Sequence, residues 1–551
     1  MKRIYMQINI WGAFALLCLA LPSMANAQSE TDPIRNTQKE LRGSARFQSM
    51  AGAFGSLGGD YSSTKQNPAG IALMRSPMDL SLTLSAYSTK FKSSWTGSNN
   101  DKTKGGVDFD AFSFASCSRR SYSGWSFSYG FGLQKDAVFD RKIDIKGGFD
   151  NAGSIHSLGD YFAGLLNLTA LGNGGYNSIT KKDLLGDDAY SRYPWAPVLG
   201  YDAGFITSDT DKGGPYYSRF RYGAGAGKPV GPSTASMVLT EKGATTNFDF
   251  TFGANYDERV YIGGSFIYST FYREITSAYN ESFVKPDYLY LENYQKTTGG
   301  GLGGSLGVIV QPFDGFKLGL SYFTPMFYSL TDKYSGYAET HYKIPVEPST
   351  TNLFTKANTP NGGSTDFDLT TNGRFVGSAS YVFGRYGLLS VDYEYTNFAD
   401  VKLKSPDEND GYKYTNLALK DDFGAQHTLR IGAEARPTDR LSVRAGYMMR
   451  TSPIKDERIK NTDGPATKEV YIDRTLPHYT LDKGLSAITA GVGFRITPKF
   501  TADLALVWTT NKSYTYSFPS INDKDVKVTS LPPIKTDRND LHLALTLGYR
   551  L

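Results

Sequence analysis

Apolar and polar residues alternate along most of the chain, and the alternation is clearest in its last segment. Every second residue from Leu541 to Leu551 is leucine or tyrosine, whereas His542 and Arg550 have the opposite parity. A period of two residues is typical of a β-strand with one apolar face. Upstream segments repeat it with charges on the second face, for example Arg444. A charge that faced lipid near the middle of a membrane would cost roughly 2–4 kcal/mol, so we expect these charges to point into a lumen.

Fourteen segments with this alternation predict an all-β fold, a 14-stranded antiparallel transmembrane β-barrel in the outer membrane of a Gram-negative cell. No run of 18 apolar residues follows residue 27, and strands can satisfy their backbone hydrogen bonds within lipid only in a closed barrel. Tight turns at the periplasmic end are predicted at 119–122, 257–258, 312–314, 385, 437–439 and 498. The predicted strands are 78–94, 107–118, 123–135, 246–256, 259–276, 287–311, 315–342, 365–384, 386–404, 412–436, 440–455, 485–497, 499–517 and 538–551.

The residues before the first strand do not alternate. The stretch 43–77 is rich in glycine and small residues, and Gly58-Gly59 together with Asn67-Pro68-Ala69-Gly70 is turn chemistry. We therefore predict that residues 28–77 form a small folded plug inside the lumen, and that residues 78–551 form the barrel.

The first 27 residues have the features of a secretory signal peptide. Lys2 and Arg3 precede an apolar core, and Ala25-Asn26-Ala27 is a cleavage site of small residues. The apolar core, residues 8–21, is shorter than the ~20 residues that a membrane-spanning helix needs. We expect residues 1–27 to direct export and to be removed.

Charge and aromatic content narrow the class of partner. The chain has 59 basic and 54 acidic residues, a balance that argues against nucleic acid as a partner. Only Cys117 follows the signal peptide, so no internal disulfide is expected. Aromatics gather near the ends of predicted strands, where we interpret them as an interfacial girdle. These aromatics are Phe271, Tyr272, Tyr322, Phe323, Phe327, Tyr328, Phe383, Tyr386, Tyr393 and Tyr395.

The predicted loop from 136 to 245 is too long to be a passive connector. Apolar residues recur in it at helical spacing and predict one amphipathic helix, and an aromatic cluster follows. Two interpretations stay open, a lid that packs on itself and an extracellular groove that captures ligand. The residues that would form the capture site are Leu158, Tyr161, Phe162, Leu165, Tyr193 and Trp195.

The plug residues resemble a known family. Ala51-Gly52-Ala53-Phe54, followed by the Asn-Pro-Ala-Gly segment and the first strand, is similar to the start of the FadL/TodX family of outer-membrane transporters of long-chain fatty acids and other hydrophobic compounds. The resemblance implies fourteen strands and an N-terminal hatch. It also implies that Asn67, Pro68, Ala69 and Gly70 gate a gap made by an inward kink of the third strand, with Gly130 and Gly132 at the kink.

Two features depart from that family. The long helical loop lies between the third and fourth predicted strands, whereas the family's groove-forming loops come later in the chain. The last residue is Leu551, not the phenylalanine usual in signals read by the barrel assembly machinery, although Tyr549 is available. The identity of the ligand therefore cannot be transferred.

We predict passive uptake of a hydrophobic small molecule, with capture in an apolar lumen and lateral release beside the plug. This needs no cofactor, metal or catalytic residue, and the expected partners are outer-membrane lipid, lipopolysaccharide and the barrel assembly machinery. A porin for polar solutes is an alternative, with Arg430, Arg444, Arg450, Asp392 and Glu394 inward.

Other classes have weaker support in the sequence. Adhesion or a structural role for the long loops leaves no periodic signal. A hydrolase is disfavoured because the five histidines lie in no catalytic motif. The acidic clusters 407–410 and 522–525 offer oxygen ligands for Ca²⁺, but we interpret them as solvated hairpin tips.

Overall fold

The computed structural model describes residues 28–118, 124–149, 155–210, 213–220, 231–283, 286–346, 349–360, 362–407, 411–455 and 476–551. The predicted signal peptide, the predicted turn at 119–122 and residues 408–410 of one acidic cluster lie outside these residues.

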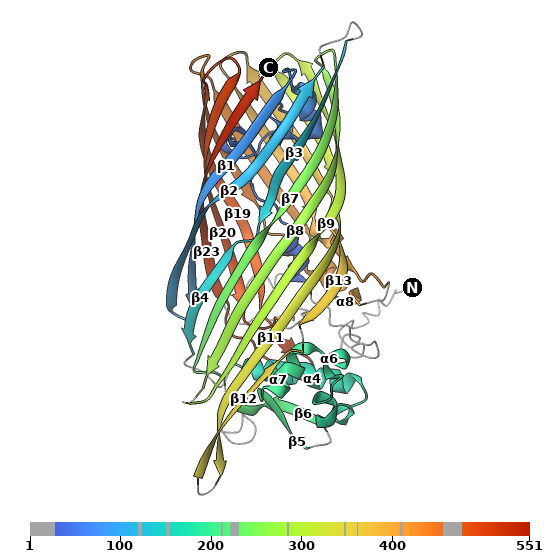
Figure 1. Ribbon diagram of the computed structural model, residues 1–551, viewed down its shortest axis with the longest axis vertical. Coiled ribbons are helices and arrows are strands. Elements are labelled where there is room, and N and C mark those ends of the chain that lie inside the picture. Colours follow the sequence, from blue (N-terminus) through green and yellow to red (C-terminus); the bar gives the residue numbers. More distant parts are fainter. Residues whose placement is uncertain are drawn as a thin grey trace, which may run out of the picture.

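A closed antiparallel barrel forms the body of the molecule, as predicted (Figure 1). The first strand pairs with the second on one side and with the last on the other, which closes the wall. Four of the fourteen wall positions are each built from two successive strands that follow one another along the same position. In order, the positions are β1 (Asp79–Trp95), β2 (Ser98–Cys117), β3 (Trp125–Val138) with β4 (Arg141–Gly148), β7 (Thr234–Tyr256), β8 (Val260–Ser282), β9 (Tyr288–Phe313), β10 (Phe316–Phe323) with β11 (Phe327–Val346), β13 (Gly363–Thr370) with β14 (Arg374–Phe383), β15 (Gly387–Asn397) with β16 (Lys402–Lys404), β17 (Ala425–Ala435), β18 (Leu441–Arg450), β19 (Tyr479–Arg495), β20 (Phe500–Tyr516) and β23 (Ile534–Arg550).

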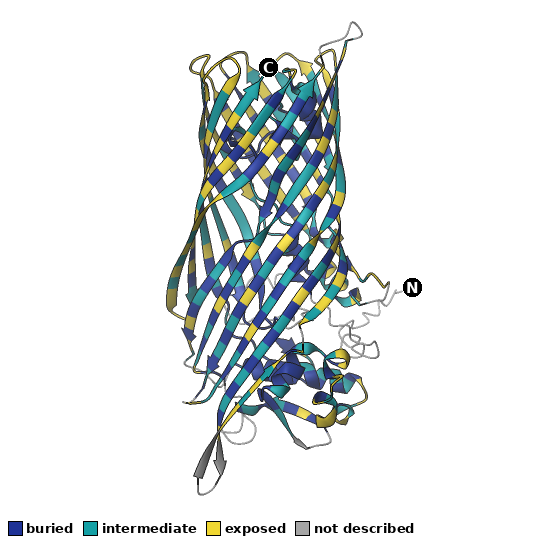
Figure 2. Cartoon of the chain, viewed as in Figure 1, coloured by how far each residue is buried: buried dark blue, intermediate teal, exposed yellow. Residues whose placement is uncertain are grey.

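Burial alternates residue by residue along the wall, as Figure 2 shows. Leu545 is 45% exposed, whereas the neighbouring Ala544 and Thr546 are buried. Arg430 and Arg444 are buried on the inner side, as the alternation predicts. Of adjacent aromatics in the predicted girdle, one faces outward and one inward: Tyr272 is 36% exposed but Phe271 only 3%. The girdle interpretation therefore fails for Phe271 and, likewise, for Phe323 and Tyr328.

Several predicted boundaries were wrong. β2 begins at Ser98, so the expected loop before residue 107 is a tight hairpin. The predicted strand 412–436 starts with the helix α8 (Lys413–Asp422), because Thr415 and Leu419 recur at helical spacing and pack inward. Pro325 interrupts the seventh wall position, since proline cannot donate to a β-ladder. The short helix η5 (Phe398–Asp400) interrupts the ninth.

A folded lid covers the end of the barrel that carries the long loops, opposite the short turns and the C-terminus (Figure 1). Short turns of outer-membrane barrels face the periplasm, and in that orientation the lid would be on the extracellular side. The predicted loop 136–245 is shorter than expected, because β4 and the first part of β7 belong to the wall. The predicted helix is present. The lid and neighbouring elements are α4 (Leu158–Gly172), η3 (Tyr176–Ser178), α5 (Lys181–Leu184), α6 (Ala189–Arg192), α7 (Trp195–Asp202), β5 (Ile206–Thr210), β6 (Gly213–Ser218), β12 (Ser349–Asn358), β21 (Ile521–Asn522) and β22 (Lys527–Val528).

Residues 28–74 lie within the bore, where they contact inward-facing groups from strands all around the wall. The Ala45 N–H donates to Thr546 of β23, and the Gly55 N–H donates to Asp392 of β15. Thr489 of β19 donates to the Ser49 carbonyl. The helical elements of this segment are α2 (Thr31–Asn36), α3 (Ala45–Ser49), η1 (Tyr61–Lys65) and η2 (Pro68–Leu73).

Candidate functional site

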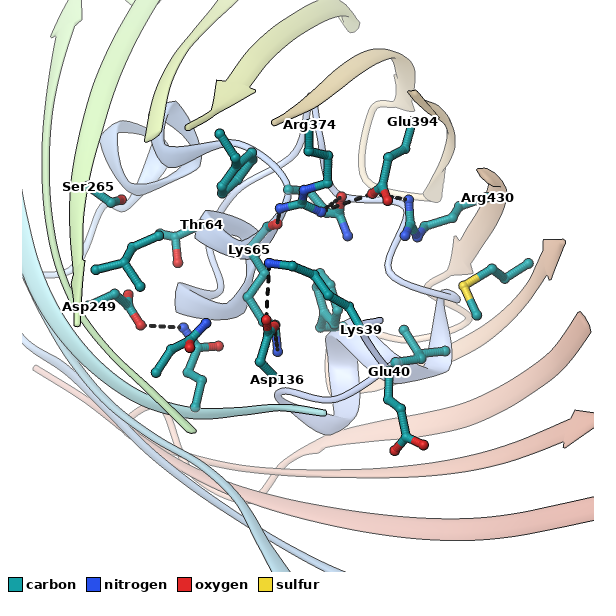
Figure 3. Close-up of a pocket in the computed structure, with 18 of the residues that line it drawn as sticks. Lys39, Glu40, Thr64, Lys65, Asp136, Asp249, Ser265, Arg374, Glu394 and Arg430 are labelled. Atoms are coloured by element: carbon teal, nitrogen blue, oxygen red, sulfur yellow. Dashed lines mark hydrogen bonds and ion pairs between the residues drawn. The ribbon is translucent and has the colours of Figure 1, made fainter. Parts of the chain in front are cut away.

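A cavity lies inside the barrel between the plug and the wall (Figure 3). Its lining is ionic. The Lys65 ammonium lies 3.3 Å from the Asp136 carboxylate, and Glu394 is 2.9 Å from Arg374 and 3.0 Å from Arg430. Burial lowers the pKa of Lys65, and the charge of Asp136 opposes that shift. The prediction of an apolar lumen is wrong at this depth, because plug and wall meet there through ion pairs.

An apolar layer lies on the lid side of this cavity. The rings of Phe139 and Phe271 are tilted by 46° to each other with centroids 5.3 Å apart, and Tyr328 meets Phe271 edge-on at 6.1 Å. Ile34 of the plug is buried in the same cluster. Phe139 occupies the break between β3 and β4, and Arg273 lies 5.9 Å from its ring centroid. Apolar side chains suitable for a hydrophobic ligand are therefore present, but they lie closer to the lid than the polar cavity does.

The wall forks between β2 and β3. Their pairing runs from Cys117↔Ser128 to Ala111↔Gln134, and further out β3 and β4 are paired with β7 while β2 is paired with β1. Among the described residues, no backbone pairing joins 98–110 of β2 to β3 or β4. We call these two facing stretches, 98–110 and 135–148, the seam.

Side chains bridge the seam in place of the missing ladder. Lys104 Nζ lies 2.5 Å from the Asp140 carboxylate, and Lys102 Nζ lies 2.6 Å from that of Asp144. Lys135 pairs with Asp108 at the fork itself. These contacts can break one at a time, whereas a β-ladder resists opening as a cooperative unit.

A β-bulge lies on each side of the fork. The pairing of β1 with β2 skips Asp110, and that of β3 with β7 skips Asp136. Bulges re-aim side chains, and here both carboxylates bind the plug. Asp110 accepts from Arg42 at 3.0 Å, and Asp136 also lies 3.0 Å from Lys39. The plug is thus attached directly to the two strands that border the seam.

The predicted gate motif lies elsewhere. The Asn67 amide donates to the carbonyls of Gly55, Val308 and Leu320 at 2.8, 3.2 and 3.4 Å, so it bridges the plug to β9 and β10. Pro68 and Ala69 pack against Gly263 of β8. Gly70 packs within the plug, close to Ser63 and the Leu57 carbonyl. The residue after the motif, Ile71, is the one that lies against the third strand, at Gly130.

Gly130 and Gly132 do not form a kink. Gly130 is paired with Ala115 on one side and with Thr251 on the other, and Gly132 is paired in the same way. Both face the ring of Tyr61, which leaves no room for a side chain there. The glycines therefore let the plug approach β3, and the fork begins beyond them.

We expect Gly307→Ala to destabilise the protein by about 1–3 kcal/mol, because the added methyl would collide with the Asn67 side chain. Gly377→Ala in β14 is the matched control, since a methyl group added there would meet nothing within 4 Å. Chemical unfolding in detergent, followed by tryptophan fluorescence, measures the difference. Equal midpoints for the two variants would show that Asn67 is not held where described.

The predicted capture residues lie in the packed lid. Leu158, Tyr161 and Phe162 are at most 3% exposed, and Tyr193 is also buried. Leu165 packs against the same core, and Trp195 meets Tyr334 edge-on at 4.9 Å. Of the two interpretations of this loop, the packing matches a lid that buries its own apolar residues.

The seam was not predicted from the sequence, because residues 95–106 were expected to form a loop between the first two strands. A signal was available. The apolar residues Val107, Phe109, Phe112 and Phe114 are spaced by two, three and two, and the extra residue marks the bulge at Asp110.

Within the described ranges, no group of three or more His, Cys, Asp or Glu side chains could hold a metal ion. The same residues include no helix that is long and apolar enough to cross a membrane.

Comparison with solved structures identifies the fold. A FadL homologue from Pseudomonas aeruginosa is 11% identical, with 93% of this chain and 99% of that chain covered and a TM-score of 0.50. The Pseudomonas putida toluene transporter TodX (10% identical, TM-score 0.47) and the Ralstonia pickettii toluene transporter TbuX (12%, 0.45) have the same coverage. No protein-family model and no curated protein matches the chain. The expected resemblance is confirmed as a likeness of fold.

Proposed function

We propose that this chain is a passive outer-membrane conduit for hydrophobic compounds, such as long-chain fatty acids, and that it releases them sideways through the seam. The observation that carries the proposal is the contrast between the two possible exits. The axial path is occupied by the plug, which is bound to the wall by many hydrogen bonds. Among the residues that the structure describes, side chains and no backbone ladder close the seam.

The route begins at the lid and passes the apolar layer around Phe139 and Phe271. Each buried CH₂ group contributes about 0.8 kcal/mol, so a long chain can be captured there without a cofactor, metal or catalytic group. Phe139 lies where β3 gives way to β4, so a ligand held against it is already beside the seam. The inner end of the seam, where Ala111 is paired with Gln134, borders the lipid-facing band. Release there enters lipid and avoids periplasmic water, in which such a ligand is poorly soluble.

Opening is coupled to the plug through the two bulged aspartates. A shift of Arg42 or Lys65 changes the contacts of Asp110 or Asp136, which flank the fork. Residues 1–27 act as the export signal in this proposal, and the Asn-Pro-Ala-Gly motif anchors the plug to β8, β9 and β10 rather than lining the exit.

The polar cavity favours a second candidate, a porin for polar solutes. Its ion pairs, such as Arg374 with Glu394, would suit hydrophilic cargo. Swelling of liposomes in sugar solutions separates the two candidates. Rapid swelling with the intact protein would support the porin, and its absence together with uptake of a labelled fatty acid would support the conduit.

Removing the seam lysines tests the lateral exit. We expect Lys102→Ala/Lys104→Ala/Lys135→Ala to raise uptake of a radiolabelled fatty acid by about threefold or more, because the pairs that hold the strands together are lost. Wild-type uptake should increase with salt, which screens partly exposed pairs, and the variant should lose that dependence.

The control is Lys90→Ala. Lys90 forms an ion pair with Asp101 at 2.7 Å, but across β1 and β2, which are already joined by a full ladder. It should leave uptake unchanged. If the triple variant and the control behave alike, the seam is not the exit.

A further inference from the structure

Strands β7, β8, β9 and β11 extend far beyond the lipid. On β8 the outward apolar residues run from Val260 to Tyr268, which matches the 9–11 residues a strand needs to cross a bilayer. Beyond them, nine residues of β9 from Tyr288 to Lys296 continue outward, about 30 Å of strand. In an outer membrane, this outer face lies among the phosphates and sugars of lipopolysaccharide.

A row of charges crosses the wall directly outside the apolar band. Lys242, Glu274, Lys296 and Lys333 are opposite one another on β7, β8, β9 and β11. Glu274 is 2.8 Å from Lys242, and the three lysines with one glutamate leave a net charge of +2.

Two of these lysines face each other without a carboxylate between them. Lys296 and Lys333 are direct cross-strand partners, and like charges in that position destabilise a sheet. An anion bound between them removes the repulsion. The level just outside the hydrocarbon is where the phosphates of lipid A lie.

The next levels outward carry tyrosines paired with carboxylates. The Tyr290 hydroxyl donates to Glu292 at 3.1 Å, and the Tyr337 and Tyr288 hydroxyls donate to Glu339 at 2.5 and 2.6 Å. Tyr288, Tyr290 and Glu339 also line an open groove. Rings with polar edges and fixed acceptors suit sugar rings, which present apolar faces and hydroxyls.

We propose that this outer face of β7, β8, β9 and β11 is a binding surface for one lipopolysaccharide molecule. The lysine row holds its phosphates and the tyrosine levels contact its core sugars. The surface is continuous with the lipid-facing band on the same strands. The acyl chains of the same molecule would therefore lie against that band, on the periplasmic side of the lysine row. The proposal rests on the outer-membrane location and not on transport, so an uptake assay can fail while this proposal holds.

The test uses full-length mature protein refolded from denaturant, which carries no lipopolysaccharide from the cell. Binding of deep-rough lipopolysaccharide is titrated by native mass spectrometry in detergent. Lys242→Ala/Lys296→Ala/Lys333→Ala should weaken it roughly tenfold or more, since each lysine near an anionic surface contributes about 1 kcal/mol. The matched control is Lys90→Ala/Lys92→Ala/Lys512→Ala, three lysines on the outer parts of β1 and β20, and it should stay close to wild type.

Two further probes separate the parts of the surface. Dephosphorylated lipopolysaccharide should bind wild type and the first lysine variant equally. Tyr288→Ser/Tyr290→Ser/Tyr337→Ser should weaken binding only of molecules that carry core sugars. Equal weakening by both lysine triples, or equal competition by phosphatidylglycerol, would overturn the proposal, because either result means general attraction of anionic lipid.

Discussion

Covalent closure of the seam is expected to abolish uptake. In a Cys117→Ser background, Lys104→Cys and Asp140→Cys put two thiols where an ion pair of 2.5 Å now bridges β2 and the turn before β4. A short bismaleimide that joins them would hold the two edges together. If hydrophobic cargo leaves between these edges, uptake of a labelled fatty acid should fall about tenfold or more, as it does when a gating segment is immobilised.

The matched pair for that experiment is Lys90→Cys with Asp101→Cys. These residues also form an ion pair, but between strands that stay joined by backbone hydrogen bonds. The same reagent there should not change uptake. Undiminished uptake after complete cross-linking of the seam pair would rule out the lateral exit, whatever the effect of the control.

Removal of the plug is expected to convert the protein into an ion-conducting pore. In a chain that lacks residues 28–74 the bore loses the groups that fill it, and wall residues such as Asp110, Asp392 and Glu434 become hydrated by solvent. Barrels of this size without internal segments enclose water, so single-channel current in planar bilayers should rise about tenfold or more over wild type.

The current would come with a loss of directed uptake, since nothing would then couple ligand to the seam. A milder variant guards against failure to fold. Arg46→Ala removes an ion pair of 3.1 Å from the plug to Glu434 and should give intermittent openings. A plug-free barrel that folds, as shown by heat-dependent mobility on gels, and yet stays silent would mean that the plug does not seal the bore.

The barrel could be predicted because its signal is periodic. Alternating segments such as 541–551 report which side chains meet lipid, and fourteen of them fix the number of wall positions. The helix α4 was also legible, since Leu158, Tyr161 and Phe162 recur at helical spacing. Each strand and the lid helix can be predicted because the pattern that indicates it lies within a single short segment.

The seam was not legible in the same way. It depends on single-residue bulges at Asp110 and Asp136, which reverse the parity of a strand and look like the end of a strand. It also depends on ion pairs between lysines and aspartates of two separate segments. Within either segment alone, these charged residues are typical of a solvated loop. The predicted position of Asn67 was wrong for another reason. Asn67 contacts Val308, which is 241 residues away in the sequence, and no local pattern indicates such a contact.

The alternation of residues predicts which side chains face the lumen, but it does not predict how polar each part of the lumen is. Inward charges such as Arg430 and Glu394 were expected, but their mutual pairing arises only when the bore closes around the plug, as does the contact of Arg374 with Gln66 of the plug. The apolar layer around Phe139 is equally non-local, because Phe271 and Tyr328 come from different strands. Polar and apolar levels inside the barrel therefore emerge from three-dimensional packing.

The lateral exit is tested most directly by measuring the width of the seam with and without cargo. Spin labels at Thr103→Cys and Lys146→Cys, in the Cys117→Ser background, report the distance from β2 to β4 by double electron–electron resonance. Labels at Lys90→Cys and Thr103→Cys report the paired strands β1 and β2 as the reference. We predict that a long-chain fatty acid shifts the first distribution to longer distances and leaves the second unchanged. A seam distribution that saturating ligand does not move, in protein that takes up the same ligand, would contradict lateral release.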